Sequence, residues 1–564
     1  GDLVVDVPQD TVVNAQVVRK AASDRVIERN PAVHLCYVEV DEPDMHKPLG
    51  DLDRLKVMLE KDWGYRDLQV EPYLLPEVQK ILRKGSWSVT AAIHRDSETQ
   101  RPTIIALWPG LHNEAYGLAC DIGSTTIAMH LVSLLSGRVV ASSGASNPQI
   151  RFGEDLMSRV SYVMMNPDGR DSMTKAVRQA VSELVDQVCT QGGVARSDIL
   201  DAVFVANPIM HHLFLGIDPT ELGQAPFALA VSGAVSCEAK DIELALNPGA
   251  RTYLLPCIAG HVGADAAGAT LSEGPHRQDK MMLLVDVGTN AEIVLGNRQR
   301  TVAASSPTGP AFEGAEISCG QRAAPGAIER VRIDAETLEP RFKVIGVEQW
   351  SDEDGFAEAA EKTGITGICG SAIIEVVAEM YLSGVISADG VVDGAMAAKS
   401  PRILENGRTF SYLLHDGAQK ITVTQNDVRA IQLAKAALYA GIKLLMEKLG
   451  VDTVDTIRFA GAFGSFIDPK YAMVLGLIPD CELSEVKAVG NAAGTGALMA
   501  LLNRDHRREI EDTVTRIEKI ETALEPHFQQ LFIDAMALPN KVDPFPKLAT
   551  VVALPERKIL AEGD

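Results

Sequence analysis

Two short segments of the chain each place an aspartate, a glycine and hydroxyl or amide residues directly after an apolar run. The first segment, 121–126, reads DIGSTT, and the second, 286–290, reads DVGTN. The runs before them, 116–120 and 281–285, have the apolar character of buried strands. One Asp-x-Gly turn carries little weight, because many ordinary turns contain it. Two such turns, each after a strand, predict a duplicated lobe that closes on one nucleotide.

The residue types in both turns suit phosphate groups and a magnesium ion. Glycine lets main-chain N–H groups approach phosphate oxygens closely, and the hydroxyls add further donors. Because hard cations prefer oxygen ligands, we expect Asp121 and Asp286 to hold Mg²⁺, directly or through water. The expected phosphate contacts are Gly123, Ser124, Thr125 and Thr126 in the first turn, and Gly288, Thr289 and Asn290 in the second.

The composition limits the class of protein and its partners. A chain of 564 residues, 46% hydrophobic and 23% charged, is globular and too long for one hydrophobic core. A formal net charge of −23 argues against nucleic-acid binding, because phosphate backbones attract basic surfaces. No apolar run reaches the roughly 18 residues that a membrane span needs. The eight cysteines form no C-x-x-C pair, which predicts reduced thiols in the cytoplasm and no zinc or iron–sulfur site.

Changes of pattern along the chain predict its domain boundaries. From residue 116 onwards apolar strands alternate with long helices, which is typical of layered α/β domains. A smaller α/β unit, with two strands and two helices, precedes this region. The expected parts are a linker at 1–30 with a helix between 11 and 28, the small α/β middle domain at 31–112, a first lobe at 113–279, a second lobe at 280–502, and a C-terminal part at 503–564 with a helix over 504–523.

Small residues late in the chain suit contact with a nucleoside. A strand at 457–460 leads to Gly461 and Gly464, and a later glycine-rich stretch contains Gly494. Such residues let the backbone lie flat against a purine or ribose, although each alone is more often a packing glycine. Neither a P-loop nor a Rossmann G-x-G-x-x-G motif is present. The order of the pieces resembles actin, sugar kinases, acetate kinase and heat-shock chaperones. This resemblance implies a duplicated, ribonuclease H-like α/β fold with two lobes that bind ATP.

Four further stretches narrow the resemblance. They are GHVGAD at 260–265, SSPTGPAFEGA at 305–315, GITGICGS at 364–371, and the segment 459–468. Together they are similar to the reductive activators of corrinoid enzymes, and the similarity runs from about residue 11 to the tail. It implies ATP- and Mg²⁺-dependent reduction of cob(II)amide to cob(I)amide on a corrinoid protein of a methyltransferase system, by a homodimer. The methyl donor and the electron donor are not identified by it.

The resemblance also implies roles for individual residues. Asp121 and Asp286 would position the nucleophilic water as well as Mg²⁺, and Gly461, Gly464 and Gly494 would lie against the adenosine. Asp265 would orient water, with a structural hydrogen bond as the alternative. Ser305 and Ser306 would face the corrinoid, with a simple turn before Pro307 as the alternative. The family's [2Fe–2S] ferredoxin domain is expected upstream of Gly1, since the cysteines of this chain do not provide it.

Two other functions stay open on the sequence. A small-molecule kinase would use the same phosphate turns, and its ATP turnover would depend on a sugar or an acid. An actin-like assembly protein would polymerise with nucleotide. The adjacent His211 and His212 point different ways on any regular element, so we expect a surface or capping role for them rather than metal binding.

Overall fold

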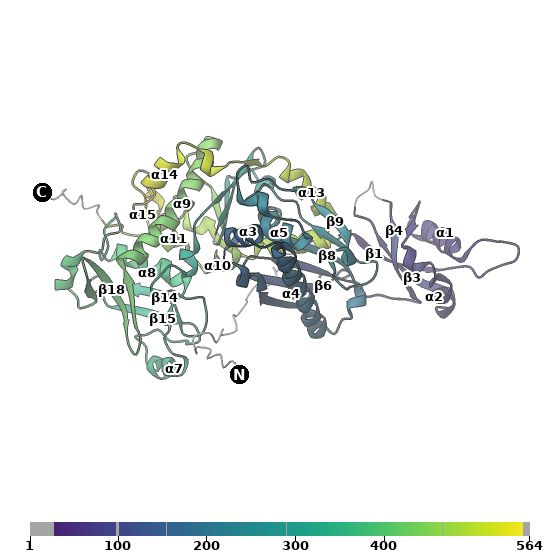
Figure 1. Cartoon of the computed structure of the whole chain (residues 1–564), viewed down its shortest axis with the longest axis horizontal. Helices are drawn as coiled ribbons and strands as arrows, with labels where there is room; N and C mark the ends of the chain where they lie inside the picture. Colours follow the sequence, from purple (N-terminus) through teal and green to yellow (C-terminus); the bar gives the residue numbers. More distant parts are fainter. Residues whose placement is uncertain (1–26, 97–100, 154, 289, 465, 556–564) are drawn as a thin grey trace. The chain divides into compact units, whose positions relative to one another are not determined.

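The computed structural model describes residues 27–96, 101–153, 155–288, 290–464 and 466–555 (Figure 1). The helix expected between 11 and 28 falls almost wholly outside these residues. The chain divides into two compact units. Among the described residues, the first unit contains residues 27–274 and 491–517, and the second contains residues 275–490 and 518–555.

The first unit begins with a small sheet whose strand order is β1-β3-β4-β2. β3 is antiparallel to β1 and β4, whereas β2 is parallel to β4. The two helices beside this sheet bury Leu55, Leu59, Val78 and Leu82 in a core of their own. The elements are β1 (Val33–Glu39), α1 (Asp51–Trp63), β2 (Gln69–Val70), α2 (Val78–Lys84), β3 (Ser88–His94) and β4 (Thr103–Pro109).

The same unit holds a six-stranded sheet of order β7-β6-β5-β8-β10-β9. β5, β6 and β7 form an antiparallel meander, and β8 and β10 continue parallel to β5. The strands are β5 (Tyr116–Ile122), β6 (Thr126–Ser133), β7 (Val139–Ser146), β8 (Ile199–Ala206), β9 (Val235–Glu238) and β10 (Arg251–Leu254). The helices are α3 (Leu156–Met165), α4 (Gly169–Gly192), α5 (Pro208–Leu215), α6 (Ala264–Glu273), α12 (Ala492–Leu502) and α13 (Arg504–Val514).

The second unit repeats this plan in a sheet of order β21-β20-β11-β12-β13-β22. β11, β12 and β13 again form an antiparallel meander, and β20 and β21 continue parallel to β11. The predicted duplication of a two-lobed α/β fold is therefore confirmed. The strands of the sheet are β11 (Met282–Val287), β12 (Ala291–Gly296), β13 (Thr301–Ser306), β20 (Thr456–Ala460), β21 (Val486–Gly490) and β22 (Glu518–Lys519).

Two three-stranded sheets and further helices complete the second unit (Figure 1). The long helix α9 begins at a capping box, in which Thr424 and Asp427 satisfy each other's backbone N–H groups. The sheets are β15-β14-β16 and β17-β18-β19, with β14 (Ala327–Ile333), β15 (Pro340–Val344), β16 (Gly367–Ile368), β17 (Ile403–Asn406), β18 (Thr409–Asp416) and β19 (Lys420–Thr424). The helices are α7 (Phe356–Thr363), α8 (Gly370–Leu382), α9 (Gln425–Leu449), α10 (Gly461–Gly464), α11 (Pro469–Leu475), α14 (Phe528–Asp534) and α15 (Pro546–Ala549).

The end of the expected second lobe differs from the structure. α12 falls within 280–502 but packs in the first unit, against α6. The two helices cross closely, because a Cβ on Gly496 would lie 2.1 Å from the carbonyl oxygen of Gly268. The helix expected over 504–523 is also shorter, since α13 ends at Val514. The chain then returns to the second unit, where β22 pairs with β13.

Within the described residues, no helix has both the length and the apolar character needed to cross a membrane.

Candidate functional site

Asp121 lies at the carboxyl end of β5, beside the carboxyl end of the parallel strand β8. Ile122 pairs with Ala206, so the turn after β5 and Asn207 after β8 share one edge of the sheet. The Asp121 side chain is 6% exposed. Ligands of open α/β sheets bind at this edge. The end of β5 therefore places the carboxylate of Asp121 where a small ligand is expected.

Three carbonyl groups of the turn at 123–126 accept hydrogen bonds from residues packed behind the turn. The side-chain amide of Asn147 donates to the carbonyl of Gly123 (2.9 Å), and its backbone N–H donates to the carbonyl of Thr125 (2.8 Å). The guanidinium of Arg159 donates to the carbonyl of Ser124 (2.7 Å). In a planar trans peptide the C=O and the following N–H point in opposite directions. The N–H groups of Ser124 and Thr125 are thus turned away from their supports, and no described residue accepts from them.

Asp265 lies near the same edge, in the first turn of α6. A Cβ on Gly263 would lie 2.6 Å from the Asp265 carboxylate and 2.7 Å from the carbonyl of Ala206. The glycine therefore allows the helix to begin close to the end of β8. The Asp265 carboxylate accepts the N–H of Ala266 at 2.8 Å. Both of its expected roles, a structural bond and the orientation of water, stay predictions.

In the second unit, Asp286 lies at the end of β11 and contacts Gly461. A Cβ on Gly461, whose φ is +84°, would lie 2.3 Å from the Asp286 carboxylate. Two residues predicted from distant parts of the chain are thus neighbours. The hydroxyl of Thr308 donates to the carbonyl of Gly288 at 2.9 Å, which supports this turn from one side. Asn290 is half-buried, and Thr289 lies outside the described residues.

A polar row crosses the second sheet beside Asp286. Asp286 lies opposite Glu292 on β12, and Glu292 lies opposite Ser305 on β13. Directly opposite residues project from the same face of a sheet, with Cβ atoms about 5 Å apart. All three side chains are half-buried. In the first sheet the matching positions beside Asp121 are Ala128 and Gly144, so the row distinguishes the two repeats.

The two serines predicted to face the corrinoid lie on opposite faces of β13. Ser306 is 0% exposed, and its hydroxyl donates to the carbonyl of Ala437 in α9 at 2.6 Å. Ser305 belongs to the half-buried polar row. Successive residues of a strand point to opposite faces. Of the pair, Ser305 is therefore the serine that a partner could reach.

The three glycines predicted to contact adenosine have different surroundings. Gly461 and Gly464 lie in α10 of the second unit, and a Cβ on Gly464 would lie 3.3 Å from the backbone of Phe459. Gly494 lies in the first unit, in the first turn of α12. A Cβ there would lie 2.6 Å from the side-chain amide of Asn491, which caps the helix. The Asn491 side chain thus occupies the space beside Gly494, and the adenosine contacts stay predictions.

Three residues at these turns escaped the sequence analysis. Glu292 interrupts an otherwise apolar strand, which is a signal that could have identified it. Asn147 precedes a proline and caps the short helix that follows, which is also a local signal. Arg159 has no such signal, because an arginine in an amphipathic helix is usually exposed.

His211 and His212 are both buried, so the surface role expected as one alternative for them is wrong, and the capping role stays a prediction. Each is 1% exposed on α5. The Nε2 atom of His212 accepts the N–H of Ala230 at 3.0 Å, so its Nδ1 donates to the carbonyl of Pro208 at 2.9 Å. The two neutral imidazoles can be buried in this way, but burial then makes each of them harder to protonate.

We expect the first unit to become less stable as the pH is lowered, because His211 resists protonation in the folded state. Burial, with His212 beside it, lowers the pKa of His211 to about 4, from 6.5 in the unfolded chain. The unfolded state therefore binds the proton first, and stability falls by about 1.4 kcal/mol per pH unit between these values. Urea unfolding across this range checks the slope. His211→Leu should reduce the slope by this amount and leave the contributions of His94 and His212, whose pKa values burial also lowers. His46→Gln, at an exposed site, should leave the slope unchanged. Equal slopes in all three proteins would contradict this assignment.

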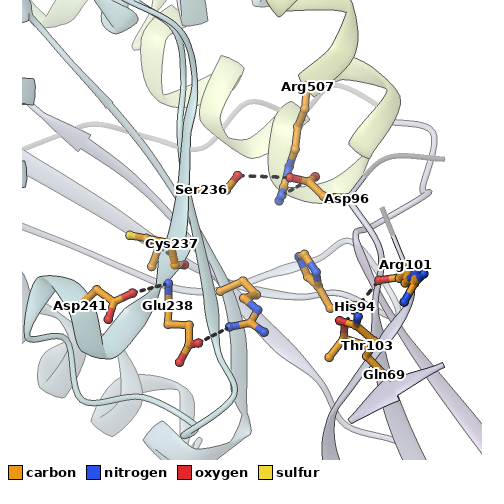
Figure 2. Close-up of a pocket in the computed structure, with 12 residues that line it drawn as sticks. Gln69, His94, Asp96, Arg101, Thr103, Ser236, Cys237, Glu238, Asp241 and Arg507 are labelled. Carbon is orange, nitrogen blue, oxygen red and sulfur yellow. Dashed lines mark hydrogen bonds and ion pairs between the residues drawn. The ribbon is translucent and has the colours of Figure 1, made fainter. Parts of the chain in front are cut away.

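A separate polar cavity of about 550 Å³ lies within the first unit (Figure 2). Residues of the small sheet, the large sheet and α13 line it. Arg507 pairs with Asp96 at 2.9 Å, and Arg251 pairs with Glu238 at 3.2 Å and also with Glu71. The guanidinium groups of Arg507 and Arg251 are thus already bound to carboxylates. Ion pairs at this cavity join Arg251 of β10 and Arg507 of α13 to Glu71 and Asp96, which follow strands of the small sheet.

Three consecutive stretches of the chain match descriptions of one protein family. Residues 22–114 match the RACo linker region, and residues 116–278 match the RACo middle region. Residues 280–549 match the C-terminal domain of RACo, its ASKHA domain. The matches are consistent with the duplicated sheets described above.

Individual relatives agree with these matches. Corrinoid activation enzyme RamQ of Eubacterium limosum is 35% identical over an alignment of 431 residues that covers 74% of this chain and 69% of RamQ. The Co(II) methylated amine-specific corrinoid protein reductase of Methanosarcina barkeri is 26% identical over an alignment of 389 residues that covers 64% of this chain and 66% of that protein. A solved structure of a reductive activator for corrinoid, iron–sulfur protein superposes with a TM-score of 0.79 at 31% identity, covering 92% of this chain and 80% of the other. The chain therefore belongs to the RACo family of corrinoid reductive activators, and its repeated sheets form an ASKHA-type fold.

Proposed function

We propose that this chain couples the binding and hydrolysis of ATP to the reduction of cob(II)amide to cob(I)amide on a corrinoid protein. Family membership supports the corrinoid part, since relatives carry names that describe corrinoid activation and Co(II) reduction. One observation carries the nucleotide part. At 123–126 the carbonyls are held from behind, which leaves the N–H groups of Ser124 and Thr125 turned outward beside Asp121.

The residues present fit Mg²⁺ and phosphate groups. Asp121 and Asp286 end equivalent strands of the two repeated sheets, so each unit offers one carboxylate next to a glycine turn. The ion, when bound, would neutralise phosphate charge and lower the barrier to attack by water. The chain's own part is to present the outward N–H groups and to hold the carboxylates in place. That both units act on one nucleotide stays a prediction from the sequence.

The electron has to come from outside the described residues. Reduction of cob(II)amide to cob(I)amide takes one electron, and hydrolysis of ATP to ADP and phosphate supplies none. All eight cysteines are free thiols, and the described residues contain no cluster of three or more His, Cys, Asp or Glu side chains fit for a metal. A reduced iron–sulfur carrier is the donor we expect, as a domain or as a separate protein.

The test is to mix the protein with a corrinoid protein in the cob(II)amide state and a reduced iron–sulfur donor. We expect ATP with Mg²⁺ to increase formation of the cob(I)amide absorption spectrum, and the cob(II)amide protein to increase ATP hydrolysis. If sugars or acids raise ATP turnover and the corrinoid protein does not, the protein is a small-molecule kinase. Nucleotide-dependent filaments without cobalt reduction would indicate an assembly protein instead.

We predict that substitution of the two serines of β13 has different effects, on cobalt reduction for Ser305 and on stability for Ser306. Ser305→Ala should slow cobalt reduction several-fold, because Ser305 lies in the half-buried polar row, on the face of β13 opposite to Ser306. Ser306→Ala should leave the reduction rate of the folded protein unchanged and lower its stability by about 1 kcal/mol, because it removes a buried hydrogen bond. Stopped-flow absorbance and urea unfolding measure the two effects. Unchanged cobalt reduction in both variants would show that neither serine faces the corrinoid.

A further inference from the structure

Arg159 lies directly behind the turn at 123–126 and is wholly buried. Its side chain, on α3, is 0% exposed. The guanidinium donates to the carbonyl of Ser124 at 2.7 Å and to the carbonyl of Gly153 at 2.9 Å, and it lies 3.3 Å from the sulfur of Met210. One cation thus links the turn to α3, to the loop before it and to α5.

This cation has no described carboxylate as an ion-pair partner. None of the acidic residues that the structure describes approaches the Arg159 guanidinium within ion-pair distance. The nearby Asp155 instead caps α3, where it accepts the N–H and the hydroxyl of Ser158. Burial lowers the pKa of Arg159 to about 10, with Asp155 opposing the change, so the group stays charged at pH 7. Among the described residues, the groups in hydrogen-bond contact with the guanidinium are neutral carbonyls and a thioether.

A buried charge of this kind is costly in the free protein and is relieved by an anion nearby. The Ser124 peptide connects the two. Its C=O faces the guanidinium, and the N–H of Thr125, on the same peptide, faces away. Hydrogen bonding to a cation polarises that peptide and makes its N–H a stronger donor. Arg159 therefore acts on whatever binds in front of the turn, although it does not touch it.

We infer that Arg159 is a positioning residue that makes the turn at 123–126 selective for highly charged phosphate chains. The ligand class is a nucleoside diphosphate or triphosphate, in preference to a nucleoside or monophosphate. The inference deepens the proposed function, on which it rests. The geometry predicts that loss of the charge weakens contacts to phosphates and leaves contacts to the nucleoside unchanged.

The test is calorimetric binding of ATP, ADP and adenosine, with Mg²⁺, to the full chain and its variants. Arg159→Met removes the charge and the donors, and Arg159→Gln removes the charge but keeps an amide donor for the Ser124 carbonyl. We expect both to weaken ATP and ADP binding by about 10- to 100-fold and to leave adenosine binding within about threefold, as for a charge-assisted hydrogen bond. Arg159→Lys should keep most of the preference for ATP over adenosine.

The matched control is Arg178→Met. Arg178 also donates to a backbone carbonyl, that of Phe214, at 3.0 Å in the same unit, and it pairs with the exposed Glu243 and not with the turn. It should lower stability without changing the ratio of ATP to adenosine affinity. If Arg159→Met does not fold, Arg159→Gln and Arg159→Lys still compare a neutral with a charged side chain. An unchanged ratio in Arg159→Gln would overturn the inference, whereas a wild-type protein that binds no ATP would overturn the proposed function itself.

Discussion

Asp286→Asn is expected to reduce ATP hydrolysis by about 10²-fold or more, the size of effect seen when one preorganised electrostatic group is lost at a transition state. Asparagine matches aspartate in shape, so packing against Gly461 is retained. The variant loses the negative charge that would hold Mg²⁺ and orient water at the end of β11. Release of phosphate at saturating ATP measures the rate, and calorimetry should show that ATP still binds.

A matched control is Asp455, which precedes β20 and lies beside the start of β11. Asp455 accepts the N–H of Met281 at 2.7 Å and is exposed, so Asp455→Asn should hydrolyse ATP at the wild-type rate. Asp121→Asn, at the equivalent strand end of the first unit, should behave like Asp286→Asn. If Asp286→Asn keeps full ATPase activity while Asp121→Asn loses it, only the first unit provides a catalytic carboxylate. If both keep full activity, the assignment of both carboxylates is wrong.

Asp286→Asn is also expected to affect cobalt reduction. Ser305 is two strands from Asp286 in the polar row, and neighbouring strands lie about 4.8 Å apart. Glu292 stands between them, so a change of charge at Asp286 reaches Ser305, the serine proposed to face the corrinoid, through one carboxylate. Two carboxylates directly opposite each other repel. A cation held at Asp286 would relieve that repulsion, which gives the nucleotide state a direct physical route to Ser305.

The repeated fold could be predicted from the sequence because its signals are local. Each antiparallel meander begins with an apolar strand that ends in Asp-x-Gly, and both strands were recognised from this pattern. The opposite orientations of Ser305 and Ser306 were also predictable, because side chains alternate along a strand. The prediction that Ser305 and Ser306 both face the corrinoid does not take this alternation into account.

The other features depend on contacts between distant segments, which no local pattern reports. α12 follows the second lobe in the chain, yet packs in the first unit because Gly496 allows close approach to Gly268, more than two hundred positions earlier. Arg159 reaches the turn at 123–126 only through the fold of α3. A buried arginine and an exposed one look alike in sequence, so this part of the site needed the structure.

Arg507→Met is expected to destabilise the first unit by about 3–5 kcal/mol, the cost of leaving a buried charge without its partner. Arg507 is 2% exposed and binds Asp201 at 2.5 Å and Asp96 at 2.9 Å. Burial opposes its charge, but the field of Asp201 and Asp96 outweighs this and raises the pKa of Arg507. Figure 2 shows the contact with Asp96, which ties α13 to the small sheet.

Unfolding in urea, followed by tryptophan fluorescence, measures this loss, since Trp63, Trp87 and Trp108 all lie in the first unit. The control is Arg300→Met, because Arg300 pairs with Glu518 at an exposed site in the second unit. An exposed pair contributes about 0–1 kcal/mol, so this variant should stay close to wild type. Equal losses in the two variants would show that burial of the Arg507 pair has no special cost.

Two further measurements test whether the unpaired charge of Asp201 causes the loss of stability. They are the pH dependence of the loss and the effect of a second substitution. Burial raises the pKa of Asp201, and the loss of Arg507 removes the group that opposes this rise. In Arg507→Met, the Asp201 carboxyl then binds a proton more readily in the folded state than in the unfolded chain. The loss of stability relative to wild type should therefore shrink as the pH falls toward 3.8, the ordinary pKa of aspartate. Arg507→Met combined with Asp201→Asn should recover most of the loss at neutral pH, because no buried charge is left unpaired at that position. A deficit that is independent of pH and additive in the double variant would mean that Arg507 acts through its packing on Tyr253, whose ring lies 4.7 Å from the guanidinium, and not through its charge.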